Sequence, residues 1–147
     1  MFKHILIPTD GSETARKAVR AGVALAAEIG AKITGYSAQE PVPTHFYGEG
    51  YIADKQMVAE FEKRAAQFAK KAAAEVGEAA KAAGVPCSVL VTKAALPYRG
   101  IVDAAQKKDC DAIFIGSHGH RGLKKLLLGS VTHEVLTHSK IPVLVFR

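Results

Sequence analysis

Cysteine and long apolar runs are scarce in this sequence, and their scarcity excludes several classes of protein. The two cysteines, Cys87 and Cys110, form no C-x-x-C pair, so we expect two reduced thiols and neither a disulfide framework nor a cysteine-bound metal. No apolar run approaches the ~18 residues of a membrane-spanning helix. The first residues lack the hydrophobic stretch and the small-residue cleavage site of a signal peptide. We therefore expect a cytoplasmic protein without a membrane partner.

Motifs of several enzyme classes are missing as well. The sequence contains no G-x-x-x-x-G-K-[ST] loop, no G-x-G-x-x-G after its first apolar run and no G-x-S-x-G elbow. Its six histidines reproduce no H-E-x-x-H or Cys/His zinc spacing. No residue stands out as an activated base or nucleophile. Because binding alone accelerates no reaction, we expect binding with slow or no turnover.

Charge is positive overall but forms no run. The formal net charge of +6 is spread along predicted helices, which argues against nucleic acid as a partner. Hydrophobic residues make up 48% of the 147 residues, enough to build a substantial core. A chain of this length fits one domain over residues 1–147.

The most informative stretch that is present runs from Ile113 to Thr132, IFIGSHGHRGLKKLLLGSVT. It predicts a buried strand, a turn containing Gly116 and Gly119, a nine-residue spacer, and then Gly129 followed by a helix. Glycines let main-chain N–H groups approach an anion closely, and a helix beginning at Ser130 points its positive dipole end at the same space. This pattern is suited to holding phosphate groups.

The spacing G-x-x-G-x9-G-S, followed by V-T, resembles the nucleotide-binding signature of the universal stress protein family in its ATP-binding branch. The segments ILIPTDGSE (5–13) and IPVLVF (141–146) extend the resemblance over essentially the whole chain. The resemblance implies an α/β fold: a single open parallel five-stranded sheet in the order 3-2-1-4-5 with helices on both faces. Such a fold is Rossmann-like and similar to the adenine nucleotide alpha hydrolases.

The pattern along the chain fits this fold, because buried strands and amphipathic helices alternate and so predict a parallel sheet with right-handed crossovers. A helix should begin at Ser12 and end at Gly30, and another should span 53–83 with a bend or a break near Gly77. Pro97 should lie in the first turn of a third helix. The predicted strands are 2–8, 31–39, 87–93, 112–116 and 141–146. One apolar stripe of the long helix should be core: Met57, Phe61, Ala65, Phe68, Ala72 and Val76.

Two separated signals converge in this topology. Asp10 follows the first strand, and the turn 116–119 follows the fourth, so both should lie where the strand order reverses and a crevice opens. On local grounds alone Asp10 could equally be a turn or cap residue. The loop 40–52 remains open between a lid and a surface connection, and the basic residues of the spacer (Arg121, Lys124 and Lys125) are more typical of a solvated surface than of phosphate ligands.

The resemblance assigns roles to residues of the crevice. Main-chain groups of the glycine turn, including that of His118, would wrap the phosphates of ATP, Ser130 and Thr132 would add hydroxyl donors, and Asp10 would neighbour a bound Mg²⁺. The main chain at Ser37 would read adenine, although Tyr-Ser-Ala replaces the family's more usual His-Val-Val there. The complete predicted set is Pro8, Thr9, Asp10, Ser37, Ile115, Gly116, His118, Gly119, Gly129, Ser130, Val131 and Thr132.

These inferences predict an ATP-binding universal stress protein that signals through its bound state and forms a homodimer through the strand 141–146. Three alternatives stay open. The protein could be a weak ATPase, an interaction module without a nucleotide, or a binder of a different anionic ligand such as AMP, a cyclic nucleotide or another phosphometabolite. The sequence names neither the stress nor the signalling partner.

Overall fold

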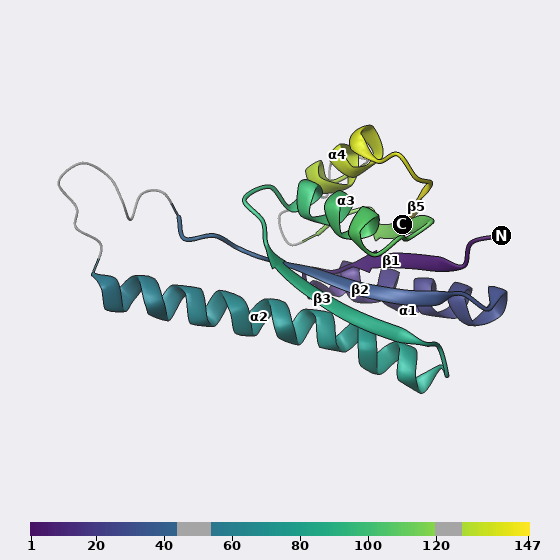
Figure 1. The fold of residues 1–147 in the computed structure, drawn as a ribbon, viewed down its shortest axis with the longest axis horizontal. Helices are drawn as coiled ribbons and strands as arrows, with labels where there is room; N and C mark the ends of the chain where they lie inside the picture. The colour runs from purple at the N-terminus through teal and green to yellow at the C-terminus, as the bar shows by residue number, and fades with distance from the viewer. Residues whose placement is uncertain (44–53, 120–127) are drawn as a thin grey trace.

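The structure is a computed structural model that describes residues 1–43, 54–119 and 128–147. Strands and helices alternate along these residues, as the sequence predicts (Figure 1). In chain order the elements are β1 (His4–Pro8), α1 (Glu13–Ile29), β2 (Lys32–Gln39), α2 (Lys55–Ala82), β3 (Cys87–Lys93), α3 (Pro97–Lys107), β4 (Ala112–Gly116), α4 (Ser130–His138) and β5 (Val143–Phe146).

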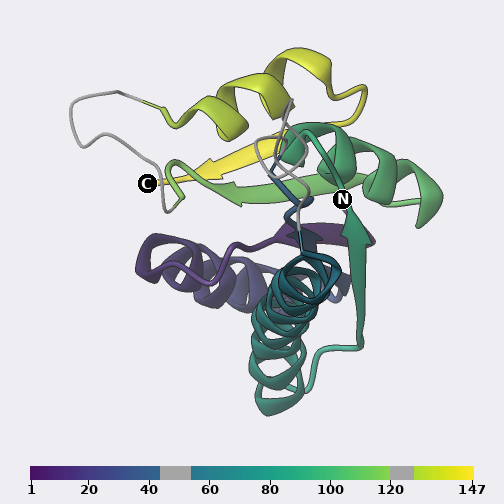
Figure 2. The ribbon, with the colours of Figure 1, turned by 90° about the vertical axis from the view of Figure 1, so that its left-hand side faces the viewer.

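The strands form one parallel sheet in the order β3-β2-β1-β4-β5, which confirms the predicted topology. Helices α1 and α2 cover one face, and α3 and α4 cover the other (Figures 1 and 2). Strand β1 is central and buried along its whole length, as its continuous apolar run predicts. Since all strands run the same way, their carboxyl ends meet at one edge of the sheet.

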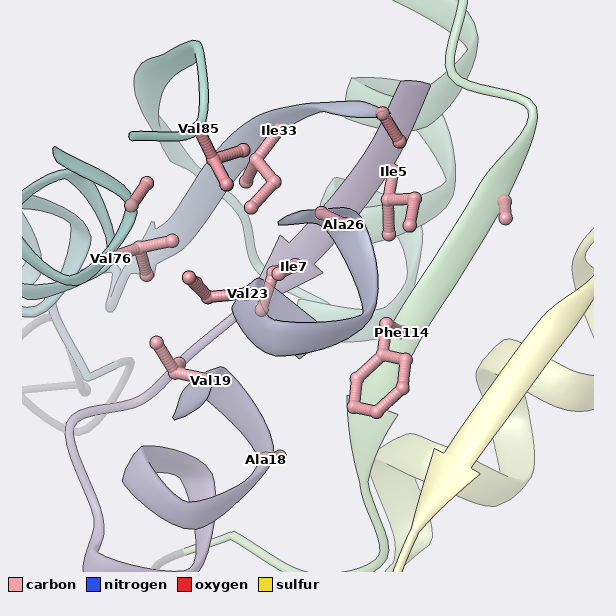
Figure 3. Close-up of a cluster of buried hydrophobic side chains, with 13 residues drawn as sticks. Ile5, Ile7, Ala18, Val19, Val23, Ala26, Ile33, Val76, Val85 and Phe114 are labelled. Atoms are coloured by element: carbon pink, nitrogen blue, oxygen red, sulfur yellow. The ribbon is translucent and has the colours of Figure 1, made fainter. Parts of the chain in front are cut away.

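Two hydrophobic clusters fix the helices to the sheet. On the first face, Ile5 and Ile7 of β1 pack with Val23 of α1, Val76 of α2 and Phe114 of β4 (Figure 3). On the other face, the cluster is built from residues of β1, β2, β4 and the two helices above them: Leu6, Tyr36, Ile101, Ala104, Ala105, Cys110, Ile113, Ile115 and Val135. Both faces of the sheet are therefore apolar, as a doubly covered parallel sheet requires.

Helix α1 begins and ends as the sequence predicts. The Ser12 hydroxyl accepts a hydrogen bond from the Ala15 main-chain N–H at 3.1 Å, and Glu13 places a carboxylate in the first turn. Gly30 ends the helix in the left-handed conformation. Arg16 of this helix donates to both carboxylate oxygens of Glu75 at 2.8 and 3.0 Å, which joins α1 to α2.

Helix α2 differs from the prediction in two respects. It is a continuous helix of 28 residues, so of the predicted bend or break near Gly77 the break is wrong. A Cβ on Gly77 would lie 3.4 Å from the Val89 side chain, which is an ordinary van der Waals contact. The predicted core stripe is wrong at Met57 and Phe68, which are 45% and 55% exposed.

The reason is the length of α2 relative to the sheet. Its buried residues all lie between positions 69 and 80, while residues 55–68 extend past the carboxyl ends of the strands (Figure 1). The heptad-like spacing of apolar residues continues beyond the surface that it packs against. Periodicity identified the helix correctly but could not say where its supporting sheet ends.

The last strand is shorter than predicted, beginning at Val143 instead of Ile141. The Ser139 hydroxyl donates to the Ile141 carbonyl at 2.7 Å and accepts from the Ile141 N–H at 3.2 Å, so this segment is a turn. None of the helices in the described ranges is long and apolar enough to cross a membrane.

Candidate functional site

The turn after β1 is held by its own polar groups. The Asp10 carboxylate accepts a hydrogen bond from the Ser12 N–H at 3.0 Å, and the Thr9 hydroxyl accepts one from the Gly11 N–H at 3.1 Å. Gly11 has φ of +74°, which glycine adopts without strain and which lets the chain reverse into α1. The Thr9 N–H donates to the Tyr36 carbonyl at 2.8 Å, so the turn is also attached to β2.

The turn after β4 is attached to two neighbouring elements. The Ser117 N–H donates to the Phe146 carbonyl of β5 at 2.7 Å, and the Ser117 carbonyl accepts from the Gly129 N–H at 2.7 Å. The Thr132 hydroxyl donates to the Gly116 carbonyl at 2.8 Å. These bonds bring the start of α4 directly onto the glycine turn, although more than ten residues of chain separate them.

The two turns meet at Asp10 and Gly119. A Cβ built on Gly119 would collide with Asp10 Oδ2, so the absence of a side chain is what allows the carboxylate to lie there. Gly129 is similarly enclosed, since a Cβ on it would lie 3.2 Å from the Ser117 carbonyl oxygen and 3.3 Å from the His118 Cα. The predicted convergence of the first and fourth strand ends is confirmed.

Two predicted phosphate donors are engaged elsewhere in this structure. The Gly129 N–H and the Thr132 hydroxyl hydrogen go to the Ser117 and Gly116 carbonyls, and Thr132 is only 3% exposed. A hydroxyl has a single hydrogen to donate, so both groups fix the turn instead of facing the crevice. The first turn of α4 contains the main-chain N–H groups of Ser130, Val131 and Thr132. These three groups have no acceptor within the helix.

The other predicted residues surround these turns at different depths. Ser37 is 2% exposed and lies within β2, opposite Val91 of β3, two residues before the strand ends. Ile115 is 7% exposed and belongs to the second core cluster, against which Val131 also packs. The His118 ring nitrogen Nδ1 lies 3.1 Å from the Ser117 hydroxyl. Pro8 is buried at the end of β1.

Two segments that the sequence analysis left open lie outside the described residues. They are the spacer with Arg121, Lys124 and Lys125, and most of the loop 40–52, which could be a lid or a surface connection. Within the described part of the chain, no group of three or more His, Cys, Asp or Glu side chains could hold a metal ion.

Two cavities lie away from the crevice. One of about 490 Å³ lies between α1 and the end of β5, and its lining includes Lys17, Arg20 and Phe146. Another of about 370 Å³ lies between β3 and α3 and includes Thr92 and Asp103. Neither is lined by a predicted site residue.

The amino ends of the strands carry polar contacts that sequence reasoning missed. The Asp111 carboxylate accepts from the Lys3 N–H at 2.8 Å and from the His4 N–H at 3.0 Å. His4 Nε2 lies 2.8 Å from the Thr34 hydroxyl. Burial, followed by the charge of Lys32, lowers the pKa of His4, and burial raises the pKa of Cys110 to about 11. The sequence signal for these contacts was Asp111, which comes directly before the buried strand β4.

Comparison with known proteins gives the family context of this geometry. The model of the universal stress protein family matches residues 1–147. Universal stress protein MJ0577 of Methanocaldococcus jannaschii is 32% identical over 156 aligned residues, covering 100% of this chain and 96% of the relative. A solved structure of MJ0577 superposes with a TM-score of 0.81 at 28% identity, covering 99% of this chain and 95% of that one.

Two further solved structures share the fold. A universal stress protein in complex with cAMP has a TM-score of 0.67 at 24% identity and covers 99% of this chain and 97% of its own. A universal stress protein from Archaeoglobus fulgidus in complex with dAMP has a TM-score of 0.63 at 20% identity, covering 100% of this chain and 98% of its own. At these identities the likeness extends to the fold alone.

Proposed function

This chain belongs to the universal stress protein family, and from that premise we propose that it binds an adenine nucleotide, ATP first among them, in the crevice between the turns 9–12 and 116–119. The contact that carries the proposal is the Asp10 carboxylate against the Cα of Gly119. This contact brings the turns 9–12 and 116–119, together with the start of α4, around one space. Nothing in the packing of the core requires glycine at 119.

The first turn of α4 is the proposed phosphate-binding element. Main-chain N–H groups of Ser130, Val131 and Thr132 point along the helix axis toward the crevice, and the helix dipole favours negative charge at this end. Gly129 and the Thr132 hydroxyl hold this helix start against the turn at Gly116. Their role is to preorganise the phosphate site, so a ligand meets donors that are already positioned.

Magnesium is a proposed companion of the nucleotide. Mg²⁺ is usually held by one or two carboxylates together with phosphate oxygens and water. Asp10 supplies one carboxylate beside the phosphate-binding turn, which fits that donor set once a triphosphate is present. Removing Mg²⁺ should therefore weaken ATP binding much more than AMP binding.

The choice of nucleotide rests on weaker support than the phosphate site. Two proteins of the same fold were solved with cAMP and dAMP, which supports an adenine ligand in this crevice. The segment Tyr36-Ser37-Ala38 is more polar than the family pattern, so AMP and a cyclic nucleotide remain alternatives to ATP. Binding would act by stabilising one conformation or assembly for a signalling partner. A weak ATPase is the enzymatic alternative.

The deciding experiment is mass spectrometry of small molecules released by heat from freshly purified protein, with calorimetry of added ATP and Mg²⁺. ATP at near one per chain is the expected result. Recovery of AMP or a cyclic nucleotide would keep the site and change the ligand. An empty protein that also fails to bind added nucleotide would leave an interaction module as the function. A turnover assay on protein free of contaminating ATPases separates a binder from an ATPase.

We further propose a homodimer through β5. This strand is at the edge of the sheet, and edge strands are usually paired or covered. Val143→Lys should shift the mass in solution from dimer to monomer, measured by light scattering. Because Val143 also packs on the second core cluster, a thermal melt must show that the variant stays folded. Thr137→Lys, on the exposed side of α4, is the matched control, and an unchanged dimer in Val143→Lys would refute this interface.

A further inference from the structure

Phe68 occupies an unusual position for a large aromatic residue. It is 55% exposed, and it lies immediately before Ala69, the first buried residue of α2. A Cβ built on Gly11 would lie 3.6 Å from Phe68 Cζ, so the tip of the ring lies close to the turn that follows β1 and borders the crevice on this side. Phe68 belongs to α2, the helix that extends past the strand ends (Figure 1).

The geometry separates the two ends of a bound nucleotide. The phosphate-binding start of α4 lies on the β4 side of the central strand β1, because Ser117 and Gly129 are bonded there. A base bound over the end of β2 would lie on the other side of β1. Helix α2 packs on β2 and β3, and the Gln39 side chain at the end of β2 reaches the Glu62 carbonyl of α2 at 3.5 Å.

We propose that Phe68 is the aromatic wall on which the nucleobase stacks, and thus a specificity-determining residue of the site. The inference rests on the proposed function and goes beyond it by assigning recognition of the base to α2. Aromatic rings bind the faces of nucleobases well and offer no hydrogen bond to a phosphate. An exposed Phe beside the turn 9–12, across β1 from the proposed phosphate-binding start of α4, suits a ligand that combines an anionic end with a flat apolar face.

The test compares ATP with inorganic tripolyphosphate, which has no base, by calorimetry with Mg²⁺ on the full chain. Phe68→Ala should weaken ATP binding by about 5- to 150-fold, as expected for a lost base–aromatic stack, and leave tripolyphosphate binding unchanged. Phe68→Leu keeps most of the apolar volume but should remain weak. Phe68→Tyr restores the aromatic face and should recover binding. AMP and cAMP carry the same base and should show the same fold-loss where they bind.

Met57→Ala is the matched control, since Met57 is an exposed apolar residue farther along the same helix. It should bind ATP like the wild type. Equal ATP affinity in Phe68→Ala and wild type would overturn the inference. So would an equal loss for ATP and tripolyphosphate, which would make Phe68 a support of the Gly11 turn. A wild-type protein that binds no adenine nucleotide overturns the proposed function itself, and that result is seen before any variant is made.

Discussion

The main chain at the two ends of the parallel sheet is held by different kinds of contact. At the amino ends, side chains satisfy the exposed main chain: the Asp111 carboxylate accepts from the N–H groups of Lys3 and His4, and His4 meets the Thr34 hydroxyl. The Thr34 hydroxyl in turn lies 3.2 Å from that of Ser88. Three strands are thus linked by side-chain hydrogen bonds.

At the carboxyl ends, closely packed glycines accompany the side-chain hydrogen bonds of Thr9, Asp10 and Thr132. Gly116 and Gly119 bring main chain into close approach with Ala18 and Asp10, and α4 begins there without a side-chain cap. A helix start without a capping side chain leaves N–H donors for a ligand. Side-chain hydrogen bonds thus hold the amino ends of the strands, while the start of α4 at the carboxyl ends keeps main-chain N–H groups for the ligand that we propose.

The largest expected effect comes from filling the carboxyl end. Gly119→Val should reduce ATP affinity by about 100-fold or more, because its side chain must displace Asp10 from the crevice. Calorimetry with ATP and Mg²⁺ measures the loss. Gly84→Asn is the matched control at the opposite end, since Gly84 has φ of +69° in open space and Asn tolerates that conformation. Normal binding by Gly119→Val would remove the main support for the site.

Removing the side-chain hydrogen bonds at the amino ends of the strands should lower stability and leave ATP affinity unchanged. Asp111→Ala removes the acceptor for two main-chain N–H groups and should lower the free energy of unfolding by about 1–2 kcal/mol. Chemical denaturation measures this change. ATP affinity should stay within error of the wild type, since Asp111 is at the far edge of the sheet. A clear loss of affinity would mean that the two ends are coupled.

A smaller effect is expected from pH. Burial lowers the pKa of His4 in the folded protein. As the pH falls below about 6.5, the pKa of histidine in an unfolded chain, the unfolded chain binds a proton before the folded protein does, so stability decreases. The charges of Lys32, Asp109 and Asp111 act on the same ring, with Lys32 opposing protonation and both aspartates favouring it. The melting temperature should fall between pH 7 and pH 5.

His4→Gln isolates this contribution from the other histidines. Glutamine can still bond to the Thr34 hydroxyl but does not titrate, so the variant should lose less stability than the wild type over the same pH range. Identical slopes for His4→Gln and wild type would show that His4 is not protonated on unfolding in this range.

The sequence predicted those parts of the fold whose causes are local. The buried run of β1, the Ser12 cap of α1 and the glycine turn after β4 each follow from neighbouring residues. The convergence of Asp10 with Gly119 also followed, because parallel strands bring their carboxyl ends together.

The remainder depended on distances between separated elements. No local pattern shows that the Thr132 hydroxyl bonds the Gly116 carbonyl, sixteen residues earlier, or that Asp111 meets Lys3 across the sheet. The exposure of Phe68 is a further case, since it depends on where β2 and β3 end relative to α2. Predicting such features requires knowledge of the register of the whole sheet.

The length of α2 affects how fast the protein diffuses in solution. Residues 55–68 make a projection of roughly 20 Å at the helical rise of ~1.5 Å per residue. A body with such an arm diffuses more slowly than a sphere of equal mass, so a monomer should elute early from a sizing column. Elution volume alone would then overstate the number of subunits, and the stoichiometry has to come from scattered light or from sedimentation equilibrium.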